Sequence, residues 1–147
     1  GRVTVMGSSC QVDFYVLANP AQSAHQLVCR LAMMAWEQGH RVAVVTANQQ
    51  ESDSLDEIMW DYPAGRFLPH QKGASPANTP ICIDVSGADI TPDRTVVINL
   101  ADTVVPEPSR FSRLLEIVPG AEQKRQASRE KFREYRKLGL EPAHIKI

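Results

Sequence analysis

Residues 26–47, QLVCRLAMMAWEQGHRVAVVTA, contain the two patterns that decide the predicted fold class. In the first half, apolar residues recur at the spacing of one helix face: Leu27, Val28, Leu31, Ala32 and Ala35. Gly39 then fits the position after a helix end, where glycine is preferred. The second half, RVAVVTA at 41–47, is apolar on both faces, as strands buried in parallel sheets tend to be. A helix followed at once by such a strand indicates an α/β fold.

The same alternation extends in both directions along the chain. Further strands are predicted at residues 11–17, 66–68, 81–85, 95–100 and 115–118. Helices are predicted from Asn19-Pro20 to Gly39, from Asn48 to Met59, over 108–114 and from Ala121 to Leu138. Residues 71–80, with Gly, Ser, Asn and two prolines, are predicted to be a loop. Strands that alternate with helices predict a single doubly wound, mostly parallel sheet.

Two helix ends carry recognisable capping sequences. Asn48, with Glu51 three residues later, resembles a capping box. Near the end of the chain, Gly139 and Leu140 follow the last predicted helix in the order of a Schellman motif. These pairs predict where the second helix begins and where the last one ends.

Length and composition favour one soluble domain. The chain has 147 residues, enough for one well-buried core, and no apolar run approaches the ~20 residues of a membrane span. Residues 1–11 show no periodicity and are predicted to be a flexible leader before a domain at 12–147. Cys10, Cys29 and Cys82 are odd in number and form no CxxC pair. They indicate free thiols in a reducing compartment, and a cytoplasmic location is expected.

A doubly wound sheet raises the possibility of a nucleotide site. In a dinucleotide fold, the first strand-to-helix turn carries glycines so that the backbone can approach the pyrophosphate. Here the turn reads LANPAQS at residues 17–23, without glycine, and no GxxxxGK[ST] motif occurs. The sequence therefore predicts a Rossmann-like fold without the dinucleotide-binding loop, and no cofactor.

A degenerate nucleotide- or metal-dependent enzyme is the first alternative. Asp84 and Asp102 lie near the carboxyl ends of two predicted strands, where active sites of open α/β sheets gather. Asp is also common in turns after strands, where its side chain bonds local amides. His25 and Cys29 are four residues apart on a predicted helix, but two ligands do not make a zinc site. We expect no catalytic residue and no metal.

The final predicted helix, AEQKRQASREKFREYRK at residues 121–137, is strongly basic within a chain of net charge −1. Four arginines fall along one side of it: Arg125, Arg129, Arg133 and Arg136. Guanidinium groups pair bidentately with carboxylates and phosphates. Phe132 and Tyr135 interleave with the arginines and could form the wall of an apolar pocket. This combination favours an acidic peptide with an apolar anchor, and a direct nucleic-acid binder is a second alternative.

A second candidate surface is aromatic. Trp60, Tyr62 and Phe67 cluster at the end of the second predicted helix and in the turn after it. They suit either a small satellite core cluster or a protein interface, since Trp and Tyr are enriched at interface hot spots. The sequence leaves both possibilities open.

Four stretches resemble the chi subunit of bacterial DNA polymerase III: DFYVL at 13–17, QLVCRLAMMAWEQGHRVAV at 26–44, LDEIMWDYPAGRFLPH at 55–70 and RFSRLLEIVPGAEQKRQASREKFREYRKLGL at 110–140. The likeness runs from about Val12 to the C-terminus. It implies a nucleotide-binding-like α/β fold without a nucleotide function, in a non-catalytic accessory subunit. Such subunits bind the psi subunit, which tethers them to the clamp-loader complex, and the acidic C-terminal tail of single-stranded DNA-binding protein.

The resemblance also implies site residues. By position, the tail site comprises Val118, at the end of a predicted strand, and Arg129, Phe132 and Arg133 on the basic helix, which also carries Arg125. The psi-facing surface includes Trp60 and Phe67, with Tyr62 beside them, and in some bacteria a helicase competes for it. Two positions depart from the family pattern, since Phe132 stands where a tyrosine can stand and Arg133 where a lysine can. Nucleic acid would then be contacted only indirectly.

Overall fold

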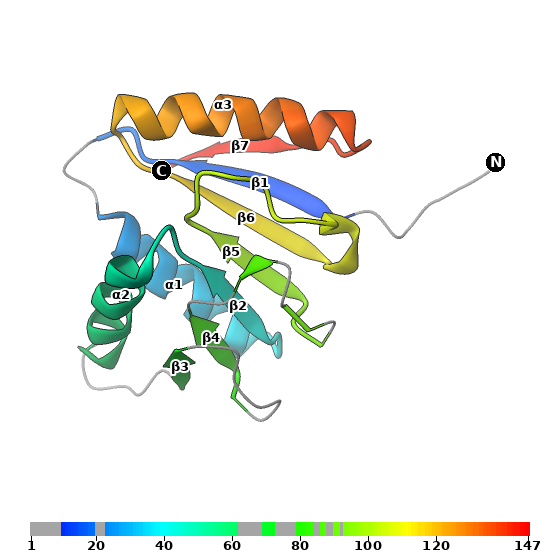
Figure 1. Cartoon of the computed structure of the whole chain (residues 1–147). Coiled ribbons are helices and arrows are strands. Elements are labelled where there is room, and N and C mark those ends of the chain that lie inside the picture. The colour runs from blue at the N-terminus through cyan, green and yellow to red at the C-terminus, as the bar shows by residue number, and fades with distance from the viewer. Residues whose placement is uncertain are drawn as a thin grey trace.

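The computed structural model describes residues 10–19, 23–61, 69–72, 79–83, 86–87, 90–91 and 93–147. Among these residues one sheet of seven strands forms, in the order β3-β4-β2-β5-β6-β1-β7, and every pairing between neighbours is parallel (Figure 1). The strands are β1 Gln11–Val16, β2 Val42–Val45, β3 His70–Lys72, β4 Ile81–Ile83, β5 Val96–Asn99, β6 Arg113–Val118 and β7 Ala143–Lys146. The helices are α1 Ala24–Glu37, α2 Gln49–Asp61 and α3 Glu122–Lys137. The predicted α/β class with a doubly wound sheet is confirmed.

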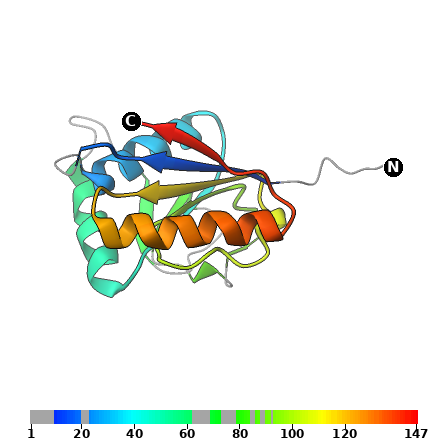
Figure 2. The ribbon, with the colours of Figure 1, turned by 90° about the horizontal axis from the view of Figure 1, so that it is seen from above.

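The sheet separates two apolar clusters. α1 and α2 pack on one face, where Val28, Leu55 and Met59 are fully buried. α3 and the segment before β6 cover the other face (Figures 1 and 2). Side chains alternate along β1, so Phe14 joins the cluster under α3 while Tyr15 packs against the cluster under α1. Central strands such as β2 are buried along their whole length, as the apolar run predicted.

α1 begins later than predicted. Ser23 is extended and its Oγ accepts a hydrogen bond from the amide of Gln26 at 3.1 Å, which caps the helix. The prediction that Asn19-Pro20 opens the helix was wrong, because a capping hydroxyl at Ser23 satisfies the first-turn amide; Pro20 itself lies outside the described residues. The end is as predicted, with Gly39 at φ +89°.

The predicted cap of α2 is present with one difference. The Asn48 side chain accepts a hydrogen bond from the Glu51 amide at 2.8 Å. The Glu51 carboxylate, in return, accepts from the amide of Ala47 at 2.8 Å, one residue before the position of the standard box. The helix therefore starts where the sequence indicated.

Three predicted boundaries differ from the structure. The helix predicted over 108–114 is only a 3₁₀ turn at Pro108–Arg110, and β6 starts at Arg113, two residues before the predicted strand. Tertiary pairing overrides the local helical signal, since Leu114 is fully buried and pairs with Val12 of β1. β3 occupies Gln71 and Lys72, which were predicted as loop, and the strand predicted at 66–68 lies outside the described residues.

The start of the chain is described only in part. Of the predicted leader, Cys10 and Gln11 are described; Cys10 is buried and Gln11 begins β1. A flexible leader stays a prediction for residues 1–9. Cys10, Cys29 and Cys82 are buried, and none of them forms a disulfide within the described parts of the chain. Within the described residues, no helix is long and apolar enough to cross a membrane.

A strand that the sequence did not predict follows α3. Leu140 N donates to the Tyr135 carbonyl at 3.1 Å and Gly139 N donates to the Arg136 carbonyl at 3.0 Å, the two bonds of the predicted Schellman motif. The chain then reverses and β7 runs beside β1, at the edge of the sheet. Its register places His144 beside Phe14 and Lys146 beside Val16.

Replacing Gly139 by Ala should lower the free energy of unfolding by about 1–2 kcal/mol, the cost of a left-handed backbone for an L-residue. A Cβ there meets no atom within 4 Å, and φ is +91°, so the cost is purely conformational. Urea denaturation measures it. Gly139→Asn should lose less, because Asn tolerates this conformation; equal stability of Gly139→Ala and the wild type would contradict the assignment.

Candidate functional site

A cavity of about 240 Å³ lies between α3 and the edge strand β7. Its residues come from four elements and are of two kinds, an apolar floor and a polar, mostly cationic rim. They are Phe14, Val16, Val118, Arg125, Ser128, Arg129, His144 and Lys146. None of these described lining residues carries a carboxylate. The cavity thus combines apolar surface with positive charge beside the edge strand β7.

The direction of the elements explains this lining. α3 runs antiparallel to β1, β6 and β7, as Figure 2 shows. Because side chains alternate along a strand, His144 and Lys146 share the α3 face with Phe14 and Val16, their partners in the β1 register. Val118, the last residue of β6, closes the floor. Three strands and one helix are therefore needed to form the cavity.

An aromatic cluster borders the cavity. The Phe132 ring stacks on the His144 ring, with centroids 4.7 Å apart and an interplanar angle of 4°. Phe14 contacts both rings, at 5.4 Å from Phe132 and 5.8 Å from His144. Phe132 is only partly buried, so this cluster offers an apolar surface to solvent beside the cations.

The sequence-predicted residues of the basic helix separate in space. Val118, Arg125 and Arg129 line the cavity together, and Phe132 borders it through its stack on His144. Arg133 is exposed and is not among the described residues that line this cavity. Arg136 lines a second cavity, of about 410 Å³, which it shares with Phe132.

The cavity arginines differ in how they are held. Arg129 and Glu122 lie 3.5 Å apart, and both side chains are mostly exposed, so this ion pair is easily replaced. Arg125 donates from Nη2 to the Leu17 carbonyl at 3.3 Å. Its Nε is buried and has no hydrogen-bond partner among the described residues.

Beneath α3 lies a buried polar network that sequence reasoning missed. Glu116 of β6 is fully buried, and its carboxylate accepts hydrogen bonds from Lys131 at 2.6 Å, Tyr135 at 2.5 Å and Asn99 at 2.8 Å. Tyr135 was predicted to interleave with the arginines as the wall of a pocket, and this was wrong: it is fully buried. Lys131, counted among the basic residues of the helix, is buried as well. The sequence offers one signal for this network, the charged residue Glu116 within the otherwise apolar run of β6.

Burial dominates the titration of this network. It raises the pKa of Glu116 above its ordinary value of 4.5, against the opposing effect of Lys131 and of the hydrogen bonds from Lys131, Tyr135 and Asn99. Burial and the neighbouring Glu116 also raise the pKa of Tyr135, which therefore stays a donor. The network fixes which side of α3 faces the sheet.

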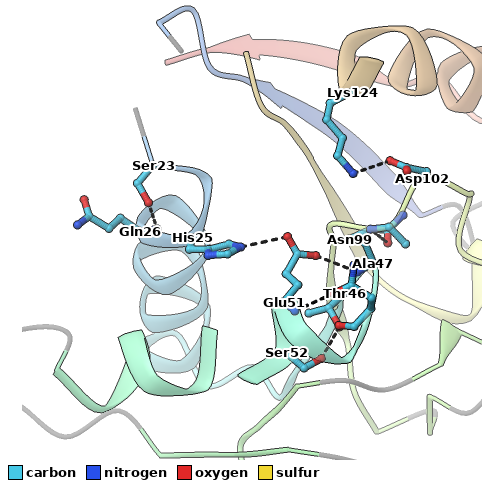
Figure 3. Close-up of polar contacts among 12 residues, drawn as sticks. Ser23, His25, Gln26, Thr46, Ala47, Glu51, Ser52, Asn99, Asp102 and Lys124 are labelled. Atoms are coloured by element: carbon cyan, nitrogen blue, oxygen red, sulfur yellow. Dashed lines mark hydrogen bonds and ion pairs between the residues drawn. The ribbon is translucent and has the colours of Figure 1, made fainter. Parts of the chain in front are cut away.

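The carboxyl edge of the sheet, where an enzyme site was the alternative, carries paired charges (Figure 3). Asp102 bonds Lys124 of α3 at 3.0 Å, and His25 of α1 bonds Glu51 of α2 at 3.0 Å. Asp84 lies outside the described residues, and Cys29 is buried in the core. No group of three His, Cys, Asp or Glu side chains in the described parts of the chain is placed to hold a metal ion.

The aromatic surface is described only at Trp60. This residue is 56% exposed near the end of α2, and its ring lies 4.8 Å from that of His70. Tyr62 and Phe67 lie outside the described residues. α2 packs on the opposite face of the sheet from α3, so Trp60 and the cavity belong to different sides of the molecule (Figure 1).

Comparison with known proteins identifies the family. The profile described as "DNA polymerase III chi subunit, HolC" matches residues 10–143. The chain belongs to the DNA polymerase III chi subunit family. Among chi subunits, that of Pseudomonas aeruginosa is 35% identical over 130 residues, covering 88% of this chain and 91% of the relative. That of Escherichia coli is 29% identical over 134 residues, covering 86% and 91%.

Solved structures share the fold at low identity. Saccharomyces cerevisiae Dbp5 bound to RNA and ADP BeF3 superposes with a TM-score of 0.66 at 10% identity, over 95% of this chain and 42% of Dbp5. T4 UvsW gives a TM-score of 0.66 at 7% identity, over 97% of this chain and 42% of UvsW. This chain therefore spans less than half of those chains, and the likeness concerns architecture alone.

Replacing Lys131 by Met should lower the free energy of unfolding by about 3–5 kcal/mol at neutral pH, because Glu116 loses its buried counter-charge. The pKa of Glu116, already raised by burial, should then rise further. A carboxyl group with a higher pKa in the folded than in the unfolded protein stabilises the folded state fully at pH values below its ordinary pKa of 4.5. This stabilisation is lost as the pH rises through the pKa of the folded state.

The variant should therefore be closest to wild-type stability near pH 5 and furthest from it near pH 8, as measured by urea denaturation at both pH values. Glu116→Gln in the Lys131→Met background is the control, and should remove this pH dependence. A loss that is the same at both pH values would contradict a buried Glu116–Lys131 pair.

Proposed function

We propose that this chi family member is an accessory subunit of DNA polymerase III that bridges the clamp-loader complex, through psi, to the acidic C-terminal tail of single-stranded DNA-binding protein. Family membership supports the polymerase complex. The cavity between α3 and β7, cationic at its rim and apolar at its floor, is the observation that supports tail binding. The protein would act in the cytoplasm without a cofactor or catalytic residues of its own.

The chemistry of the cavity suits a short acidic peptide with a ring. Arg125, Arg129 and Lys146 supply positive charge, and Val118 with the Phe132–His144 stack supplies apolar surface. One anchor and a few charge-assisted hydrogen bonds correspond to a micromolar dissociation constant, roughly −7 to −8 kcal/mol. Because the ion pairs are partly exposed, the affinity should fall as salt is added.

A nucleic-acid ligand is less well supported. The basic surface of α3 is smaller than its sequence suggests, since Lys131 is buried against Glu116 and Lys124 pairs with Asp102. Binding to single strands calls for a longer positive groove with several exposed rings on which bases stack. The net charge of −1 also disfavours it.

The second surface supports the bridging role. Trp60, with Tyr62 and Phe67 in the adjoining sequence, would bind psi, or a helicase that competes with it. Trp60 is exposed on the side of the sheet opposite α3, so both partners could bind at once. A weak tail contact suits such a bridge, because many tails on coated DNA raise the effective concentration and still allow exchange.

Arg129→Ala should weaken binding of an acidic, ring-containing peptide by about 1–3 kcal/mol, the value of a hydrogen-bonded charge. Isothermal titration calorimetry measures it. Lys137→Ala is the matched control, since Lys137 is an exposed cation at the end of α3 outside the cavity. An oligonucleotide should not bind at physiological salt. Equal peptide affinity of Arg129→Ala and the wild type would overturn the site.

Trp60→Ala should abolish co-purification with psi and leave peptide affinity unchanged, because Trp60 is 56% exposed and remote from the cavity. Leu138→Ala, which removes an apolar side chain of similar exposure (54%) at the end of α3, is the control and should retain psi. Size-exclusion chromatography of the co-expressed pair gives the result. Retention of psi by Trp60→Ala would contradict the proposed surface, and loss of both ligands would indicate misfolding.

A further inference from the structure

We propose that His70, held by Asp56, is the positioning residue of the Trp60 surface: its buried ring fixes the indole in the orientation in which a protein partner binds it. This rests on the proposed binding of psi at Trp60, and it adds how that surface is prepared before the partner arrives.

The imidazole of His70 is a fixed support. Its side chain is fully buried, and its backbone belongs to β3, the outer strand beside α2, where it pairs with the buried Ile81 of β4 (Figure 1). Nε2 of the ring lies 3.3 Å from a carboxylate oxygen of Asp56 and 3.3 Å from the Asp56 carbonyl oxygen. Two contacts at one nitrogen, on a ring that solvent does not reach, leave the imidazole little freedom to turn.

The indole of Trp60 packs on that ring. Asp56 and Trp60 are four residues apart on one face of α2, so both side chains reach the same strand. The centroids of the Trp60 and His70 rings lie 4.8 Å apart at an interplanar angle of 60°, within the range of a favourable aromatic contact. Trp60 is nevertheless 56% exposed, so a large part of the indole stays available to a partner.

A second ion pair joins β3 to α2. Lys72 pairs with Asp53 at 2.9 Å, next to the His70–Asp56 contact. Residue numbers rise along the strand as they fall along the helix, so the two elements run antiparallel and the two contacts lie side by side. The Lys72–Asp53 pair is largely exposed and contributes little to stability by itself. The support of the indole therefore depends chiefly on His70.

A fixed indole lowers the cost of binding. An exposed side chain normally exchanges rotamers, and it loses this freedom when a partner covers it. For one side chain this loss weakens binding by roughly 3- to 10-fold. Where the ring is already held in the free protein, the loss has occurred on folding instead. His70 should therefore raise the affinity for the partner without contacting it.

The test follows the indole and the partner separately. Time-resolved fluorescence anisotropy of the free protein in a Trp36→Phe background reports on Trp60 alone, because the chain has two tryptophans. The indole should turn only with the whole molecule, and His70→Ala should add a fast rotation on the nanosecond scale or below. Isothermal titration calorimetry should then show psi binding about 3- to 10-fold more weakly to His70→Ala.

Two further variants separate positioning from general loosening of β3. His70→Phe keeps a ring beneath the indole, and should restore slow rotation and a psi affinity within about 2-fold of the wild type. Lys72→Ala removes the neighbouring exposed ion pair on the same strand, and should change neither quantity. Affinity for an acidic peptide at the α3 cavity, on the other side of the sheet, checks that each variant is folded.

The outcomes distinguish this inference from the proposed function. If Trp60→Ala loses psi but His70→Ala binds it as tightly as the wild type, the surface is correct and the inference fails alone. Fast rotation of the indole in the wild type, or equal loss of psi by His70→Ala and His70→Phe with the indole still slow, would also overturn it. If Trp60→Ala retains psi, the proposed surface fails and the inference fails with it.

Discussion

The buried carboxylate of Glu116 constrains the structure on the α3 side of the sheet. A buried carboxylate that loses its charged partner destabilises a protein by about 3–5 kcal/mol. Lys131 and Tyr135, four residues apart on one face of α3, supply the charge and a hydrogen bond. Asn99 of β5 donates from Nδ2 both to the same carboxylate and to the Thr103 carbonyl. These contacts fix the rotation of α3 about its axis.

That rotation decides which side chains meet β7. With Lys131 and Tyr135 directed at the sheet, the adjacent stripe of the helix, containing Arg125, Arg129 and Phe132, lies beside the edge strand. A helix rotated by one residue would turn this stripe by about 100° and separate the arginines from Val118. A structural ion pair therefore positions the candidate binding surface without contacting a ligand itself.

The two positions at which the resemblance implied other side chains, Phe132 and Arg133, fall in different environments. Phe132 lacks the phenolic hydroxyl of a tyrosine, but its ring contacts the rings of both Phe14 and His144 and so still supplies apolar surface. Arg133 is exposed and is not among the described residues that line the cavity, so either a lysine or an arginine can be accommodated there. The sheet keeps this surface apart from Trp60, which belongs to α2 on the other face, and this separation is compatible with the proposed bridging role.

Much of the fold followed from the sequence, because local signals decide it. The apolar runs predicted five of the strands, and the Asn48–Glu51 and Gly139–Leu140 pairs located two helix ends, since caps and buried strands depend on neighbouring residues. The sequence also predicts the basic helix and three of the cavity residues, Val118, Arg125 and Arg129. The family follows from the sequence in the same way.

Only the tertiary structure decided what surrounds those residues. β7 is four residues long and carries little intrinsic signal; it exists because β1 offers an unpaired edge once the Schellman turn reverses the chain. Tyr135 and Lys131 looked like surface residues of a polar helix, and their burial depends on Glu116 of a distant strand. Contacts between remote segments leave no periodic pattern in the sequence. The side of the cavity that β7 forms, with His144 and Lys146, therefore could not be predicted from the sequence.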